Sequence, residues 1–186
     1  MYAVDHTRGA ATFSWWRDVW QLRRGRPVAH AAVERCGEGE LVRVVARVKA
    51  DALIEGALHG TRGVFRRVVF SAHGMVWVHE RGVDFSLVDG DERVLVCVGG
   101  GRMIAPREEL IEYPAHRLDG FGVPALRGRG SVLAREHVIM DGALVEVVGH
   151  KTMMADPAGV PSGYRDLRQL AALRASRSQE LLVVMR

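Results

Sequence analysis

Apolar and polar residues alternate along much of the middle of the chain. The alternation is clearest in residues 42–49, where Val42, Val44 and Val48 are separated from one another by residues that include Arg43 and Arg47. A period of two sends one set of side chains into a core and the other towards solvent. Comparable short segments follow at 64–70, 75–79, 84–89, 93–98, 132–140 and 144–149. The pattern therefore predicts a series of short β-strands.

Turn residues lie between these segments. Asp141-Gly142 separates 132–140 from 144–149, and residues 71–74 and 90–91 separate other neighbouring pairs. Asp-Gly supplies the positive φ values that tight turns require, so we expect hairpins at these places. Glycine within strands of branched residues favours strong curvature. The expected fold is mainly β (α+β): a small, OB-like antiparallel β-barrel.

One strand motif occurs twice. Residues 39–46 read GELVRVVA and residues 142–149 read GALVEVVG. Each copy has a glycine turn, then branched residues, then a small residue where the strand bends or is closely approached. The motif indicates a curved β-structure and carries no chemistry of its own.

The two ends of the chain have a different pattern. Residues 13–24 have the spacing of a short amphipathic helix, and a linker follows. Near the other end Leu167, Leu170 and Leu173 recur at helical spacing, which predicts a C-terminal helix, and residues 181–184 form an apolar strand. We therefore divide the chain into an N-terminal Trp/Arg-rich segment, residues 1–37, and a β-barrel domain with a closing helix and strand, residues 38–186.

The order of these motifs resembles that of the GIDE domain, also called BAM ("beside a membrane"). The resemblance is carried by a strand that ends Val-x-x-Arg-Val at residues 44–48, and then by residues 58–64 (LHGTRGV), 85–89 (FSLVD), 94–96 (VLV), 136–149 (EHVIMDGALVEVVG) and 163–166 (GYRD). It implies a β-rich binding domain located near a membrane. Family members often add membrane-spanning helices or a RING zinc module; this sequence has no spanning helix and only two cysteines, which cannot build a RING site.

Composition adds few constraints. The net charge is +4, and only two of the 26 cationic residues are lysines, which is more simply explained by GC-rich, bacterial coding than by phosphate binding. The N-terminus lacks the layout of a signal peptide. We expect a cytoplasmic protein, with peripheral membrane contact left open.

The N-terminal helix is the strongest functional candidate. Its aromatic stripe and the cations beside it consist of Phe13, Trp16, Trp20, Arg17, Arg23 and Arg24. Aromatic and arginine side chains are typical of protein interfaces. They are also typical of helices at a membrane surface. The third alternative is that the stripe packs on the protein's own barrel.

The alternative function is single-stranded nucleic-acid binding on the barrel. OB-like sites combine a basic groove with aromatic stacking platforms. The cations that would supply such a face are first Arg43, Arg47, Arg66 and Arg67, and in addition Arg81.

No motif indicates catalysis. Residues 99–102 (GGGR) follow a strand but lack the Gly-Lys-Ser/Thr ending of a phosphate loop. The eight histidines have no metal-ligand spacing, and no serine lies in a nucleophile elbow. We predict no cofactor, no metal and no enzyme activity, and we expect a binding domain that recognises a protein partner through the N-terminal helix and a glycine-rich segment around Phe121.

Overall fold

The computed structural model describes residues 6–9, 20–72, 75–106, 109–116, 121, 130–156 and 169–186. Nearly all of the regular structure in them is strand. The strands from the first half of the chain are β1 (His6–Gly9), β2 (Arg26–Pro27), β3 (Leu41–Lys49), β4 (Ile54–Glu55), β5 (Arg62–Gly63), β6 (Phe65–Ala72), β7 (Met75–Gly82) and β8 (Phe85–Asp89). Those from the second half are β9 (Glu92–Cys97), β10 (Gly101–Ile104), β11 (Ile111–Pro114), β12 (Ser131–Ile139), β13 (Leu144–Ala155), β14 (Gln169–Arg174) and β15 (Leu181–Met185). A 3-10 helix, η1, spans His30–Arg35.

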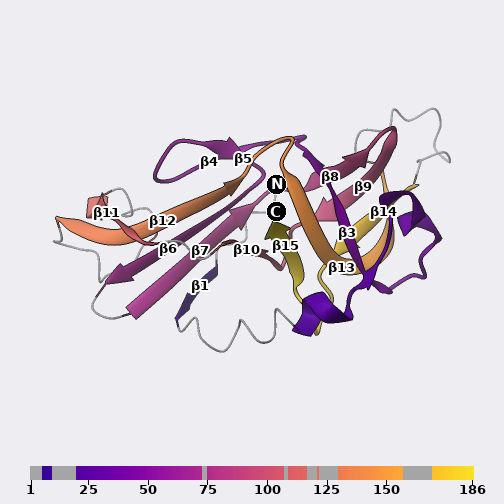
Figure 1. Cartoon of the computed structure of the whole chain (residues 1–186), viewed down its shortest axis with the longest axis horizontal. Helices are drawn as coiled ribbons and strands as arrows, with labels where there is room; N and C mark the ends of the chain where they lie inside the picture. The colour runs from indigo at the N-terminus through magenta and orange to yellow at the C-terminus, as the bar shows by residue number, and fades with distance from the viewer. Residues whose placement is uncertain are drawn as a thin grey trace.

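Five strands close into a barrel in the order β3, β8, β9, β14, β13 and back to β3 (Figure 1). The predicted small β-barrel is confirmed. It is mixed rather than wholly antiparallel, because β9 and β14 run parallel. Alternation along a strand reports its buried face and not its direction, so the sequence pattern could not identify this pair.

The two copies of the repeated motif lie side by side, and their pairing closes the barrel. β3 and β13 are antiparallel, with Val44 opposite Val147. These two valines occupy the same position in the two copies, so the motif pairs with itself about a local twofold axis. Gly149 is the small residue of the second copy, and a Cβ there would lie 2.6 Å from Leu181 Cδ1. The predicted close approach of another segment to this small residue is therefore confirmed, and the segment is the side chain of Leu181.

The barrel encloses the larger of two hydrophobic cores. Fully buried side chains from its five strands include Val44, Phe85, Val96 and Leu173. η1 packs against β3, β8, β9 and β14 and adds the buried Val33 to this core. Residues 30–35, which the sequence assigns to the N-terminal segment, thus pack as part of the barrel.

A second sheet extends from the barrel, with the strand order β1-β7-β6-β12-β11 (Figure 1). The hairpin β6–β7 pairs as predicted, and it is inserted between barrel strands β3 and β8. β11 and β12 are inserted between barrel strands β9 and β13. A small core of its own lies on one face, around Val68, Phe70 and Ala134.

The predicted C-terminal helix is wrong where the structure describes it. Residues 169–174 form β14, and the preceding residues 157–168, with Leu167, lie outside the described part. Four consecutive side chains, residues 170–173, are buried in this strand. A short apolar run of this kind fits a strand buried on both faces as well as a helix stripe, and its spacing cannot tell them apart. The predicted final strand, β15, is confirmed and lies between β13 and β10.

The predicted hairpin between 132–140 and 144–149 is also wrong. β12 and β13 follow one another through a tight turn at Gly142, where φ is +78°, but they belong to different sheets. The turn packs against the end of β3 instead: Gly142 N–H donates to Val48 O at 2.9 Å, and Asp141 Oδ1 accepts from Ala50 N–H at 2.7 Å. These bonds direct β13 into the barrel.

Candidate functional site

The described end of the N-terminal helix lies on the outside of the barrel. Residues 20–24 are helical, and the face that docks is formed by Gln21 and Gly25. Gln21 is 4% exposed, and its side-chain amide donates to the Glu180 carbonyl. A Cβ on Gly25 would lie 2.9 Å from Val148 Cγ1. This turn therefore packs on the protein's own barrel, through a glutamine and a glycine rather than through a tryptophan.

Trp20 lies on the other side of this turn and is 51% exposed. The guanidinium carbon of Arg24 lies 3.6 Å from the centroid of a Trp20 ring. A cation stacked on an indole at this distance restrains both side chains. Arg23 is exposed beside them. Three other residues of the predicted stripe, Phe13, Trp16 and Arg17, lie outside the described residues.

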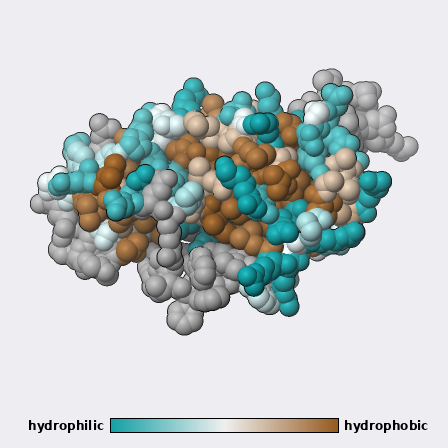
Figure 2. All heavy atoms as spheres, viewed as in Figure 1, coloured by the Kyte–Doolittle hydropathy of each residue, from teal (hydrophilic) through white to brown (hydrophobic). Residues whose placement is uncertain are grey.

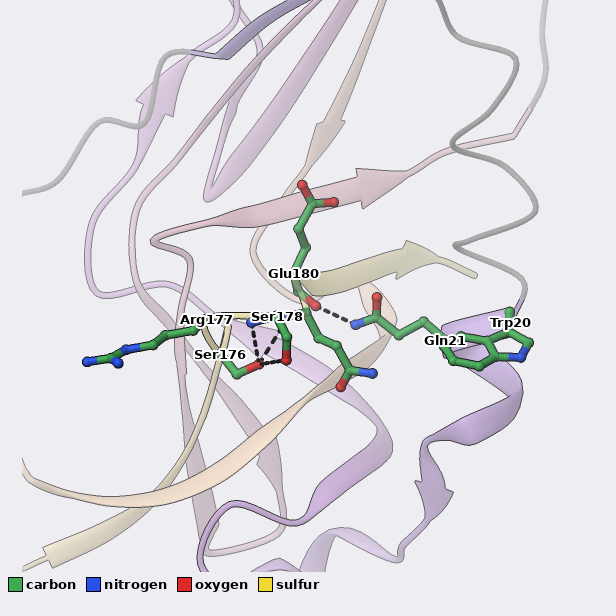
Figure 3. Close-up of a pocket in the computed structure, with 7 residues that line it drawn as sticks. Trp20, Gln21, Ser176, Arg177, Ser178 and Glu180 are labelled. Carbon is green, nitrogen blue, oxygen red and sulfur yellow. Dashed lines mark hydrogen bonds between the residues drawn. The ribbon is translucent and has the colours of Figure 1, made fainter.

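A pocket of about 400 Å³ lies between Trp20 and the loop that joins β14 to β15 (Figure 3). It is lined by Trp20, Gln21, Ser176, Arg177, Ser178, Gln179 and Glu180. In Figure 3, Trp20 and Gln21 come from the helix on one side, and Arg177 points away from the pocket on the other. The pocket thus has one aromatic wall, and the rest of its lining is polar.

The loop that forms the polar wall is held by its own hydrogen bonds. Ser176 N–H donates to Gln179 O at 2.8 Å, and Ser176 Oγ accepts from Gln179 N–H at 3.1 Å. The Gln179 side chain bonds His150 of β13, with 2.8 Å between Oε1 and Nε2. The loop is therefore fixed to the barrel, and the pocket is largely preformed.

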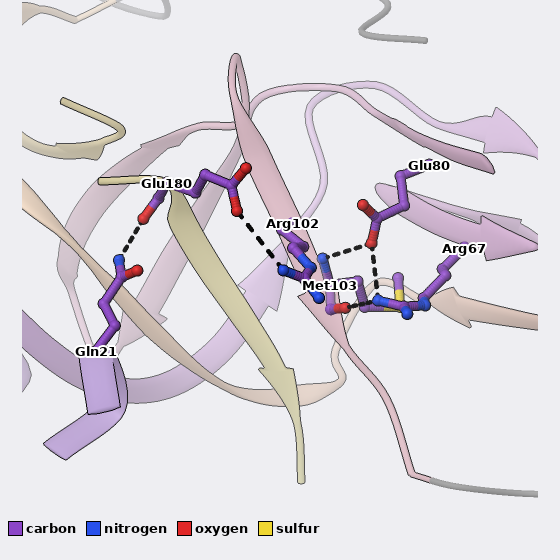
Figure 4. Close-up of polar contacts among 6 residues, drawn as sticks. All are labelled: Gln21, Arg67, Glu80, Arg102, Met103 and Glu180. Atoms are coloured by element: carbon purple, nitrogen blue, oxygen red, sulfur yellow. Dashed lines mark hydrogen bonds and ion pairs between the residues drawn. The ribbon is translucent and has the colours of Figure 1, made fainter. Parts of the chain in front are cut away.

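A chain of polar contacts leads from this pocket to the second sheet (Figure 4). Glu180, whose carbonyl accepts from Gln21, also pairs through Oε2 with Arg102 Nη1 of β10 at 3.8 Å. The next residue, Met103, donates its N–H to Glu80 Oε1 at 3.0 Å.

The edge of β10 opposite β15 is buried, and side chains of the second sheet bond it. Glu80 accepts from Met103 N–H, and Arg67 donates to Met103 O. The same two side chains form an ion pair, with Arg67 Nη1 3.1 Å from Glu80 Oε1. Together they bond the backbone of β10 as a neighbouring strand would. This ion pair connects the second sheet to the barrel.

The four arginines of the alternative nucleic-acid hypothesis do not form one face. Arg43 and Arg47 lie on barrel strand β3, whereas Arg66 and Arg67 are consecutive residues of β6 and so face opposite ways. Each has a partner in this chain. Arg43 Nε lies 3.4 Å from Glu146 Oε1, Arg47 donates to Gly142 O at 3.0 Å, Arg66 donates to Glu55 O at 2.9 Å, and Arg67 pairs with Glu80.

Phe121, the other expected contact, is half-buried. Its ring centroid lies 4.2 Å from that of His79 and 6.0 Å from that of Phe70. Phe121 packs with the small core of the second sheet, because a large aromatic ring gains more from burial there than from exposure to water. Residues 117–120 and 122–129 around it lie outside the described part.

The other side chains that could take part in metal binding or catalysis have structural roles in the described part of the chain. No group of three or more His, Cys, Asp or Glu residues in the described ranges is placed to hold a metal ion. Glu136, adjacent to His137 in the sequence, accepts backbone N–H groups from Ala57, Leu58 and His59. Burial raises the pKa of the Cys97 thiol to about 11, with nearby Asp84 adding to the effect. A thiol that stays protonated is a poor nucleophile.

Figure 2 shows apolar residues gathered over the middle of the face on which β3 and β13 lie. Two exposed side chains of these strands, Val45 and Leu144, are 48% and 44% exposed. Beside Val45 is a shallow hollow of about 390 Å³, whose lining includes Arg43 and Glu146. Because that ion pair lies in the hollow, the Trp20 pocket remains the better-formed site for an aromatic or peptide contact.

Comparison with protein-family models, with curated proteins and with solved structures gives no match to this chain. Among the described residues, no helical segment combines the length and apolar character that crossing a membrane requires. The functional argument therefore rests on the pocket itself.

Sequence reasoning found Trp20, Arg23 and Arg24 but missed the opposite wall of the pocket. Ser176 and Ser178 lie in a short polar loop between two apolar runs, which was the available signal. Nothing in the spacing indicated that this loop meets a helix more than 150 residues earlier, as the bond between Gln21 and Glu180 shows with its separation of 159 positions.

Proposed function

We propose that the chain is a non-enzymatic binding domain that recognises a protein partner, and that a segment of the partner docks in the pocket between Trp20 and the 176–180 loop. The observation that carries this proposal is Trp20. It is half exposed although it forms the wall of a preformed pocket. A large indole left in water beside a pocket gains free energy when a partner covers it.

The geometry supports tight rather than loose contact. Arg24 stacks on Trp20, and Gln21 anchors the turn to Glu180. Side chains that are already ordered lose little conformational entropy on binding. Tryptophan and arginine are also the residues most enriched among those that dominate binding energy at interfaces.

The family and the finer fold assignment are part of the same proposal. The motifs that carry the GIDE resemblance include the end of the first copy of the repeated strand and all of the second. The two copies pair with each other in one five-stranded barrel. A barrel of five short strands supports an OB-like assignment. In this proposal the barrel is the rigid support, and the helix and loop on its outside make the contact.

The test is affinity capture from the native host with matched variants. Trp20→Glu removes the aromatic wall, and Ser178→Trp fills the pocket from the opposite side. Met140→Glu is the control, because Met140 is 52% exposed and lies at the turn between β12 and β13. A partner lost by the two pocket variants and kept by the control supports the proposal. Equal capture by all forms contradicts it.

The same variants also distinguish binding to a membrane surface from binding to a protein partner. Co-sedimentation with liposomes that contain anionic lipid, lost in Trp20→Glu and kept in Met140→Glu, would assign the contact to a membrane instead of a protein.

A further inference from the structure

The dipeptide Asp-Gly occurs three times in the chain, at residues 89–90, 119–120 and 141–142. This dipeptide is chemically labile in proteins, because glycine has no side chain to shield its amide nitrogen. The first and third copies lie at turns of the structure, and the second lies outside the described residues. Asp89 and Asp141 are both exposed, so access to water does not distinguish them.

The reaction of such a dipeptide is isomerisation of the aspartate. The amide nitrogen of the glycine attacks the side-chain carboxyl carbon, Cγ, and the new N–Cγ bond closes a succinimide ring. The carboxyl hydroxyl leaves as water, together with the amide proton. Water then opens the ring: cleavage between the nitrogen and the main-chain carbonyl carbon gives isoaspartate, whereas cleavage of N–Cγ restores aspartate. Ring closure therefore requires an unbonded carboxyl group, an unbonded N–H group and rotation of the aspartate.

Both reacting groups are bonded at Asp141-Gly142. Gly142 N–H donates to Val48 O at 2.9 Å, and Asp141 Oδ1 accepts from Ala50 N–H at 2.7 Å. Gly142 O also accepts from Arg47 Nη1 at 3.0 Å. These bonds must break before the ring can close, and each one broken adds to the barrier.

The turn at Asp89-Gly90 has no such bonds. Asp89 pairs with Glu92 at the end of the β8–β9 hairpin, and the turn between them consists of Gly90, with φ +60°, and Asp91. No hydrogen bond or ion pair joins the Asp89 carboxylate or the Gly90 N–H to the part of the chain that the structure describes. Rotation of Asp89 requires only the last pair of the hairpin to open, and terminal pairs open at little cost.

We propose that Asp89-Gly90 is a site of spontaneous covalent modification, at which Asp89 isomerises to isoaspartate, and that the bonds to β3 and the residue after it protect Asp141-Gly142. The product carries one more carbon in its main chain at the end of β8, and a free α-carboxylate at the tip of the hairpin. This site is independent of Trp20 and its pocket.

The test is to keep the folded protein at neutral pH and elevated temperature, below its melting temperature, and to follow each dipeptide by mass spectrometry. Trypsin cleaves after arginine and lysine, so it places the three dipeptides in separate peptides, residues 82–93, 118–127 and 136–151. Chromatography separates the isomers, and electron-transfer fragmentation identifies the isoaspartate. Isoaspartate should accumulate at residue 89 at least about tenfold faster than at residue 141, because only the latter must lose its hydrogen bonds.

Two controls separate the effect of the fold from that of the local sequence. In guanidinium chloride the bonds to Val48 and Ala50 are lost, so the rates at residues 89 and 141 should become similar. The variant Asp89→Glu should lose the isomer from peptide 82–93 while Asp84 and Asp91 remain in it, since glutamate would have to close a larger ring, which forms more slowly.

Three results would overturn the proposal. The first is isoaspartate that accumulates equally at residues 89 and 141 of the folded protein, or at neither. The second is a difference between them that persists in guanidinium chloride, because the flanking residues and not the fold would then cause it. The third is an Asp89→Glu protein whose peptide 82–93 still forms the isomer at the wild-type rate.

Discussion

The barrel and the second sheet are stabilised in different ways. The barrel is closed, and the side chains in its centre, such as Phe85 and Leu173, are apolar and fully buried. The second sheet is open, and its core around Phe70 is small. Polar contacts therefore contribute to its stability. The ion pair of Arg67 with Glu80 joins the second sheet to β10, and Glu136 binds the backbone of the loop 57–59.

This difference suggests a division of roles. Apolar side chains form the closed interior of the barrel, whereas the second sheet depends on charged groups at partly covered positions. The barrel carries its proposed contact site on its outside, at Trp20. The barrel is the support for that site.

The largest effect is expected in the barrel core. Phe85→Ala should lower the free energy of unfolding by about 3–5 kcal/mol, because the rigid closed barrel cannot collapse into the space left behind. Phe70→Ala should cost less, since its stacked neighbour Trp77 is only half-buried and can move towards it. Urea unfolding followed by circular dichroism measures both. If Phe70→Ala proves equally or more costly, the contrast between the two regions is mistaken.

An intermediate effect is expected where the two regions join. Glu80→Gln removes the charge that balances Arg67 and weakens the acceptor for Met103 N–H. The loss should be about 2–3 kcal/mol, because removing one partner of a buried ion pair leaves a charge without compensation. The matched control is Glu40→Gln, in the exposed pair with Arg26, which should change stability little.

The measurement is again urea unfolding, with one addition. Hydrogen exchange should rise in β6 and β7 of Glu80→Gln more than in β3 and β13, because the ion pair holds the second sheet to the barrel. A uniform rise over all strands would show that the pair stabilises the whole molecule equally.

The smallest effect on stability near neutral pH is expected from the Cys97 thiol, whose contribution changes only at alkaline pH. Its raised pKa, about 11, means that the folded protein keeps this proton at pH values where the unfolded chain has lost it. The resulting stabilisation is fully present below the unfolded pKa of about 9 and is lost as pH rises through about 11. In a Cys36→Ser background, iodoacetamide at pH 8 should therefore label the folded protein about 100-fold more slowly than the unfolded one. Similar rates would contradict the burial of this thiol.

Much of the barrel could be predicted because burial there follows one simple period. The alternation around Val44 located β3, and the repeated motif indicated β13 and the close approach at Gly149. The prediction of a C-terminal helix was wrong because residues 170–173 of β14 are buried on both faces of the strand, so that their side chains do not alternate between apolar and polar. Sheet membership also escaped prediction: the turn at Asp141-Gly142 is real, but a turn does not determine whether its two strands pair.

The candidate site was only half predictable. Trp20 and Arg24 stood out because aromatics and arginines at helical spacing are informative in themselves. Gln21 did not, since nothing in a sequence marks which glutamine will be buried beneath a helix.

The pairing that closes the barrel also has a consequence for how the chain folds. β3 and β13 meet across a long stretch of sequence, as the bond between Arg47 and Gly142, 95 positions apart, illustrates. Contacts between residues so distant form slowly, since the entropy of a large loop must be lost before they stabilise anything. The local hairpins β6–β7 and β8–β9 should therefore form first. The β3–β13 pairing should form late and limit the folding rate.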